Sequence, residues 1–221
     1  MFTIDPIFAQ GSSLQFERAV NSAIGYFEQH IQNNMTISIE FAQQPISANA
    51  VAQTSAAYDN TEFTYSQIKS AILSHITDPI QAIAASFLPQ TSPFGSSLFQ
   101  ISNAEAAALN LPTNYSPNEK YNGQNIDGVV TLNSIYSYSY THTNVQPNQF
   151  DAVGTLEHEI SEVLGRLEYQ LQGGLQTVDR RPPHFHCARP DRFYAPDPVE
   201  FRALFLNIWG NIEHGIHRRP I

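Results

Sequence analysis

The N-terminal part of the chain carries two clear patterns of apolar and polar positions. Between residues 13 and 32, apolar side chains recur at three- and four-residue steps, as at Val20, Ile24 and Phe27. This spacing predicts an amphipathic helix. Over residues 35–41 apolar and polar residues alternate strictly, which predicts a strand with one buried face.

Capping residues mark the helices expected in the middle of the chain. Residues 43–61 are mostly polar and are expected to form a loop. Three later segments begin with residues typical of helix N-termini. These are Ser or Thr three positions before Glu or Gln, and Asp directly before Pro. The helices predicted in this way are 64–76 (Thr64 with Gln67), 78–88 (Asp78 before Pro79) and 104–109 (Ser102 with Glu105).

Two further strands are suggested downstream. Residues 125–133 contain the apolar run Gly128–Leu132 and predict a strand. Residues 136–140 alternate tyrosine with serine. Alternation alone favours an amphipathic strand, and an aromatic rim that contacts substrate is the alternative.

The chemistry-bearing part of the sequence is a predicted helix at residues 149–167. His158 and Glu162 are four positions apart, so they project from one face of this helix. Glu159 lies beside them. Two side chains on one helix face can hold a metal ion, and a neighbouring carboxylate can accept a proton from a water molecule that the ion polarises. The usual motif is H-E-x-x-H; here a carboxylate, which also ligates zinc, takes the last position.

The string at residues 158–166, H-E-I-S-E-V-L-G-R, resembles the active-site helix of a family of bacterial, exported zinc metalloproteases. In that family the helix is H-E-I-S-E-V-M/L-G-R. Segments F-T-I-D near residue 2, M-T-I-S-I at 35, S-F-L-P at 86 and I-D-G at 126 are similar too. The likeness spans about residues 1–166. It implies a zincin-type fold, bound zinc and hydrolysis of peptide bonds.

The same string is also similar to the start of the metzincin pattern H-E-x-x-H-x-x-G-x-x-H. Gly165 matches the glycine and Glu168 falls on the third-ligand position. The methionine turn of metzincins has no counterpart, because both methionines, Met1 and Met35, lie upstream. A bare H-E-x-x-E pattern is otherwise common on solvated helix faces, which is the structural alternative.

Charge restricts the partners that we expect. The net charge is -9, which disfavours nucleic acid and anionic membranes as partners because both would repel the chain. The single cysteine, Cys187, excludes an internal disulfide. No Sec-type signal and no apolar run of membrane-spanning length are visible. We expect secretion by a route other than Sec, with a cytoplasmic location as the alternative.

The C-terminal quarter differs from the rest. Residues 1–165 hold three basic and fourteen acidic residues, whereas residues 166–221 hold eight arginines and six acidic residues. We expect residues 169–221 to be an atypical basic tail, frame-shifted or disordered and irregular over 170–200, with at most one helix near 199–212.

A catalytic zinc needs a third protein ligand. The candidates are Glu168, His184, His186, Cys187, Asp191, His214 and His217.

These observations predict an α+β, zincin-like domain over residues 1–168, with a small mixed sheet and an active-site helix. The expected function is that of a zinc-dependent endopeptidase acting on proteins or peptides. His158 and Glu162 are the expected metal ligands and Glu159 the general base. The alternative is a non-catalytic, exported metal- or partner-binding protein with a degenerate site.

Overall fold

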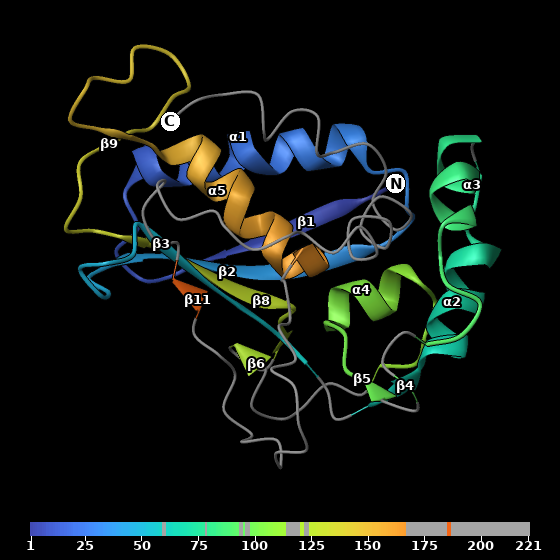
Figure 1. Ribbon diagram of the computed structural model, residues 1–221. Helices are drawn as coiled ribbons and strands as arrows, with labels where there is room; N and C mark the ends of the chain where they lie inside the picture. Colours follow the sequence, from blue (N-terminus) through green and yellow to red (C-terminus); the bar gives the residue numbers. More distant parts are fainter. Residues whose placement is uncertain are drawn as a thin grey trace.

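The computed structural model describes residues 1–58, 61–77, 79–92, 95, 98–113 and 125–166, together with the backbone of 120–121, 124 and 185–186. Its centre is a mixed five-stranded sheet in the order β1-β2-β8-β3-β11 (Figure 1). Strands β1, β2 and β8 run parallel, and β3 and β11 each pair antiparallel. The strands are β1 (Thr3–Phe8), β2 (Thr36–Gln44), β3 (Ala52–Ala56), β8 (Gly128–Asn133) and β11 (Phe185–His186).

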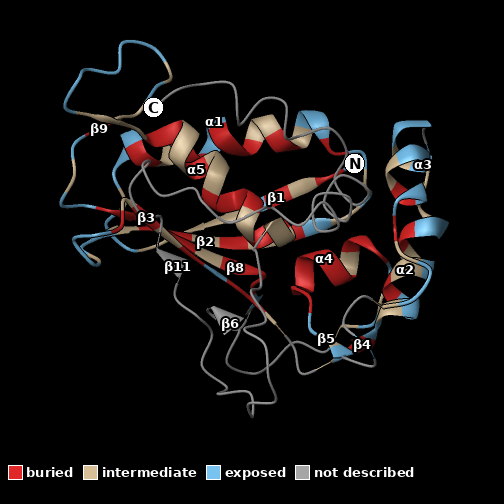
Figure 2. Ribbon diagram, in the orientation of Figure 1, coloured by how far each residue is buried: buried red, intermediate tan, exposed pale blue. Residues whose placement is uncertain are grey.

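Two helices cover one face of this sheet. α1 (Leu14–His30) and α5 (Ala152–Ser161) lie side by side above the strands (Figure 1). α5 continues into a π-helical turn, η1 (Glu162–Arg166). Their inward faces and the sheet form the core, as the buried residues in Figure 2 show. Fully buried side chains such as Phe27 and Ile160 each stabilise the fold by roughly 1.5–3 kcal/mol.

Smaller elements surround this core. α2 and α3 form the exposed edge on the right of Figure 2, and α4 lies between them and η1. No helix in the described part of the chain is long and apolar enough to cross a membrane. The remaining elements are α2 (Tyr65–Ser74), α3 (Pro79–Ser86), α4 (Asn103–Ala108), β4 (Phe63–Thr64), β5 (Leu98–Phe99), β6 (Lys120–Tyr121), β7 (Gln124–Asn125), β9 (Tyr138–Ser139) and β10 (Phe150–Asp151).

The predicted α+β class is confirmed, and the local capping signals are confirmed with it. Thr64 forms a complete capping box with Gln67, and Ser102 caps α4. Ser13 caps α1, where a helix was predicted without a capping signal. The strands predicted at 35–41 and 125–133 correspond to β2 and β8. The proposed cap Asp78 lies outside the described residues.

The loop predicted at residues 43–61 is wrong. β2 extends to Gln44, and Ala52–Ala56 forms β3, a sheet strand. Its sequence, A-Q-T-S-A, lacks the large apolar residues that usually identify a strand. Burial nevertheless alternates along it, because Ala52, Thr54 and Ala56 face the core. A second strand, β1, is also present where no element was predicted; Pro6 is accommodated there because β1 is at the sheet edge.

Three other predictions need smaller corrections. The tyrosine-rich stretch 136–140 contributes only the two-residue strand β9. The helix predicted from residue 149 begins at Ala152, because Asp151 is its N-cap and Phe150 belongs to β10. Within the segment expected to be irregular, residues 185–186 pair antiparallel with β3. The rest of the segment 169–221 lies outside the described residues.

Gly128 lets β8 approach η1 closely. A Cβ atom built there would lie 2.7 Å from the Val163 Cγ2 atom and 3.1 Å from the Ser55 carbonyl oxygen. We expect Gly128→Ala to lower the free energy of unfolding by roughly 1–3 kcal/mol, because the core must shift to admit the methyl group. Urea denaturation measures this change.

Gly25→Ala in α1 is the matched control. A Cβ atom at that position meets nothing closer than 3.9 Å. The alanine should raise the free energy of unfolding by up to about 1 kcal/mol, since alanine is the better helix former. Equal effects of the two substitutions would contradict the close packing assigned to Gly128.

Candidate functional site

The predicted ligand pair comes together on α5 and η1. The His158 Nε2 atom lies 3.1 Å from the Glu162 Oε1 atom, and the two side chains are 27 % and 14 % exposed. Consecutive helical residues are rotated by about 100°, so positions four apart lie almost above one another. The expected convergence of the two side chains on one helix face is therefore observed.

Glu159, the predicted general base, points toward the sheet. It is 1 % exposed. The Thr54 hydroxyl, also buried, lies 2.6 Å from the Glu159 Oε2 atom and 3.1 Å from the Glu159 carbonyl oxygen. A buried carboxylate is costly unless it is hydrogen-bonded, so Thr54 stabilises this arrangement. No sequence pattern singled out Thr54, which lies in the strand that was predicted as loop.

The chain folds back on itself after Glu162. Gly165 has φ 103°, in the left-handed region that disfavours residues with a side chain. This turn returns Arg166 to the helix, where its Nη2 atom lies 2.8 Å from the His158 Nδ1 atom. The Arg166 Nε–H group donates to the Ser161 hydroxyl at 2.6 Å, and that hydroxyl donates to the His158 carbonyl oxygen. Arg166 thus makes the predicted ligand His158 part of a local network.

Glu105 of α4 packs against the same turn. A Cβ atom built on Gly165 would lie 2.8 Å from the Glu105 Oε2 atom, so a second constraint favours glycine there. The Ser102 hydroxyl, at the start of α4, also donates to the Val163 carbonyl oxygen. α4 therefore holds the C-terminal end of the site helix in place.

A catalytic zinc requires three protein ligands, and the described residues bring two of the predicted candidates together. No three histidine, cysteine, aspartate or glutamate side chains in the described part of the chain gather closely enough to hold a metal ion. The third-ligand candidates lie outside the described residues, apart from the backbone of His186. That backbone pairs with Gln53, one position from Thr54.

Another histidine cluster lies at the start of α5. His142 contacts Asp151 through Nδ1 at 2.7 Å and Glu157 through Nε2 at 3.3 Å. Asp151 also accepts a hydrogen bond from the Gly154 N–H group as the helix cap. Because its two ring nitrogens face different carboxylates, His142 ties the preceding loop to α5. His142 lies in a loop, where its distance in sequence from Asp151 and Glu157 matches no motif, and no sequence pattern indicated its contacts.

The tyrosines of 136–140 serve the fold. Tyr136 donates to the Ala48 carbonyl oxygen and Tyr138 to the Val51 carbonyl oxygen, while Gln43 donates to Tyr140. The first two bonds attach the segment before β3 to residues 136–138, and the third attaches Tyr140 to β2. They favour the structural interpretation of the tyrosines over a substrate rim.

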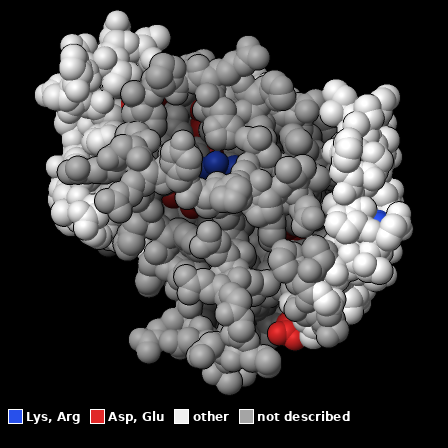
Figure 3. All heavy atoms as spheres, in the orientation of Figure 1, with Lys and Arg blue, Asp and Glu red and all other residues white. Residues whose placement is uncertain are grey.

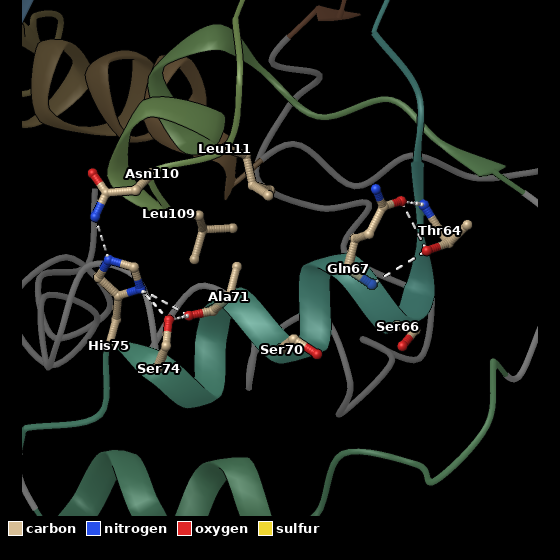
Figure 4. A pocket seen from close by; sticks show the side chains of 10 residues that line it. All are labelled: Thr64, Ser66, Gln67, Ser70, Ala71, Ser74, His75, Leu109, Asn110 and Leu111. Carbon is tan, nitrogen blue, oxygen red and sulfur yellow. Dashed lines mark hydrogen bonds between the residues drawn. The ribbon is translucent and has the colours of Figure 1, made fainter.

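An open groove of about 570 Å³ lies away from this chemistry, between α2 and the end of α4 (Figure 4). Serine hydroxyls line it, with His75 at one end. The His75 Nδ1 atom contacts the Ala71 carbonyl oxygen, and its Nε2 atom contacts the Asn110 side chain. The Nδ1 contact is made within α2, and the Nε2 contact links α2 to the end of α4. On the face shown in Figure 3, the described surface carries few charged atoms.

Burial also changes the acid–base behaviour of Glu105. Desolvation raises the pKa of its carboxyl to about 8, and a hydrogen bond from the Ser102 backbone opposes the rise. Between pH 4.5 and about 8 the folded chain keeps a proton that the unfolded chain releases. Its contribution to stability is therefore present at low pH and is lost as the pH rises through this window.

We expect Glu105→Gln to remove this pH dependence. The free energies of unfolding of wild type and variant should be similar near pH 4.5 and diverge as the pH rises, by up to about 1.4 kcal/mol for each pH unit. The variant should be the more stable at pH 8. Urea denaturation at several pH values measures the difference, and parallel stability curves would contradict a buried, protonated carboxyl.

Comparison with known proteins finds no family model, no curated protein and no solved structure that matches this chain. The chain's own residues therefore indicate what it does, above all the pair formed by His158 of α5 and Glu162 of η1 beside the carboxylate of Glu159.

Proposed function

We propose that the chain is a zinc-dependent endopeptidase whose metal centre is built on α5. The observation that carries the proposal is the approach of the His158 Nε2 atom to the Glu162 Oε1 atom, at 3.1 Å. A zincin-type fold is part of the proposal. The mixed sheet that packs against the site helix supports it.

The two side chains suit zinc in both type and spacing. Imidazole nitrogen and carboxylate oxygen bind zinc at about 2.0–2.2 Å. Two ligands of a tetrahedral ion with such bonds are separated by about 3.4 Å, close to the observed distance. His158 and Glu162 would hold the ion together with a third ligand. We take His186 as the first candidate to test, because its backbone pairs with β3 next to Thr54.

The neighbouring residues then have distinct roles. Zinc with an open coordination position supplies a Lewis acid that polarises water or a peptide carbonyl. Glu159 is the proposed general base, which accepts a proton and transfers it to the leaving amine. Thr54 orients the Glu159 carboxylate through its hydroxyl. The proposed substrate is a protein or peptide, and export by a route other than Sec remains a prediction.

A second candidate function is a non-catalytic metal- or partner-binding protein that retains the site helix. The burial of Glu159 and its bond to Thr54 favour this candidate, because a buried carboxylate bound to the sheet can serve the fold alone. The two candidates differ in hydrolysis and agree in zinc binding. A purely structural helix would bind no zinc.

We expect the purified full chain to bind zinc and to hydrolyse casein until a chelator is added. Glu159→Gln should lower hydrolysis by roughly 10²–10⁴-fold and leave the zinc content nearly unchanged, because Glu159 transfers protons and does not bind the ion. His158→Ala should lose zinc. Elemental analysis and casein hydrolysis measure the two effects.

Glu157→Gln is the matched control, since it makes the same chemical change two positions earlier on the helix, at a side chain that faces His142. It should retain both zinc and activity. Zinc binding without hydrolysis in the wild type would favour the second candidate. Absence of zinc would refute the endopeptidase and the metal-binding form of the second candidate.

A further inference from the structure

The Arg166 guanidinium is hydrogen-bonded to the imidazole of the proposed ligand His158. Its Nη2 atom lies 2.8 Å from the His158 Nδ1 atom, while its Nε–H group donates to Ser161. On the other side of the ring, the Nε2 atom is 3.1 Å from Glu162. The imidazole is therefore held between a guanidinium and a carboxylate.

This arrangement selects one tautomer of His158. A guanidinium has only N–H donors and stays protonated, so the His158 Nδ1 atom must be the acceptor. The proton of a neutral imidazole is then on Nε2, where it can be donated to Glu162. A metal ion that bound Nε2 would need the lone pair on that nitrogen, with the proton moved to Nδ1. Arg166 donates to that same Nδ1 position.

We infer that Arg166 is a positioning residue that holds His158 in the tautomer unable to ligate zinc through Nε2, so that zinc binding requires Arg166 to leave His158. The inference rests on the proposed function, because it assigns Arg166 a role toward the same metal centre. Arg166 and the ion compete for one imidazole, although they approach different nitrogens.

The fold places Arg166 there and also leaves it displaceable. The left-handed turn at Gly165, packed against Glu105, directs Arg166 back to the helix. Within the described part of the chain, no carboxylate forms an ion pair with the Arg166 guanidinium. It is held by an imidazole nitrogen, a hydroxyl and, at 3.4 Å, the His158 carbonyl oxygen. Among the described residues, zinc therefore has to draw Arg166 away from neutral acceptors only.

The test compares zinc affinity among full-length variants, measured by competition with a chromogenic chelator. Arg166→Met removes the donor, and we expect roughly tenfold tighter zinc binding than in the wild type. Ser161→Ala keeps the arginine and its charge but removes one of its anchors, so it should tighten binding in the same direction by a smaller factor. Arg18→Met, on α1, removes a positive charge elsewhere and should leave the affinity unchanged.

A second readout follows the side chains directly in NMR spectra of the full chain. In the metal-free wild type, the ring nitrogens of His158 should show a proton on Nε2 and none on Nδ1. Saturating zinc should move the proton to Nδ1 and shift the Arg166 Nε–H signal as it leaves Ser161. A proton on Nδ1 without zinc, or an Arg166 signal that zinc does not shift, would overturn the inference.

The affinities separate this inference from the proposed function. Tighter zinc binding in both site variants supports the role of Arg166. If only Arg166→Met binds more tightly, charge alone explains the effect and the inference fails, as it does if the variants match the wild type or bind more weakly. If neither the wild type nor any variant binds zinc, the proposed function fails and the inferred role of Arg166 fails with it.

Discussion

The buried hydrogen bond between Thr54 and Glu159 is the constraint on which the site depends. It joins β3 to α5 inside the core, where an unpartnered carboxylate would be strongly destabilising. It thereby sets the rotation of α5 about its axis. His158 and Glu162 lie roughly 100° and 60° around the helix from Glu159, so both point toward the same side. The direction in which the proposed ligand pair points and the burial of Glu159 are thus consequences of one helix orientation.

The end of the helix is the second determinant of the site. The π-helical turn and the left-handed Gly165 reverse the chain within one turn, and Glu105 packs against the reversal. Arg166 therefore meets residues that precede it by only one or two helical turns. The string at 158–166 behaves as a unit: its apolar members enter the core, while its polar members contact one another or Thr54.

Local signals in the sequence predicted local structure well. The predicted caps at Thr64 and Ser102 are confirmed because a cap depends on residues within three positions of it. The strand β3 was missed for the opposite reason. Its small and polar residues are buried by contacts with β8 and α5, which are far away in the chain. The five residues of the strand itself therefore contain no pattern that predicts their burial.

The same division applies to the site. The sequence by itself determined that His158 and Glu162 share a helix face, because four residues make about one turn of any α-helix. The likeness to the metzincin pattern also singled out Gly165. Only the tertiary structure decided that Glu159 faces Thr54, a partner 105 positions away, and that Glu105 packs against the turn that returns Arg166 to His158. These contacts depend on how α5 and α4 pack against the sheet and against each other, and helical spacing alone contains no information about that packing.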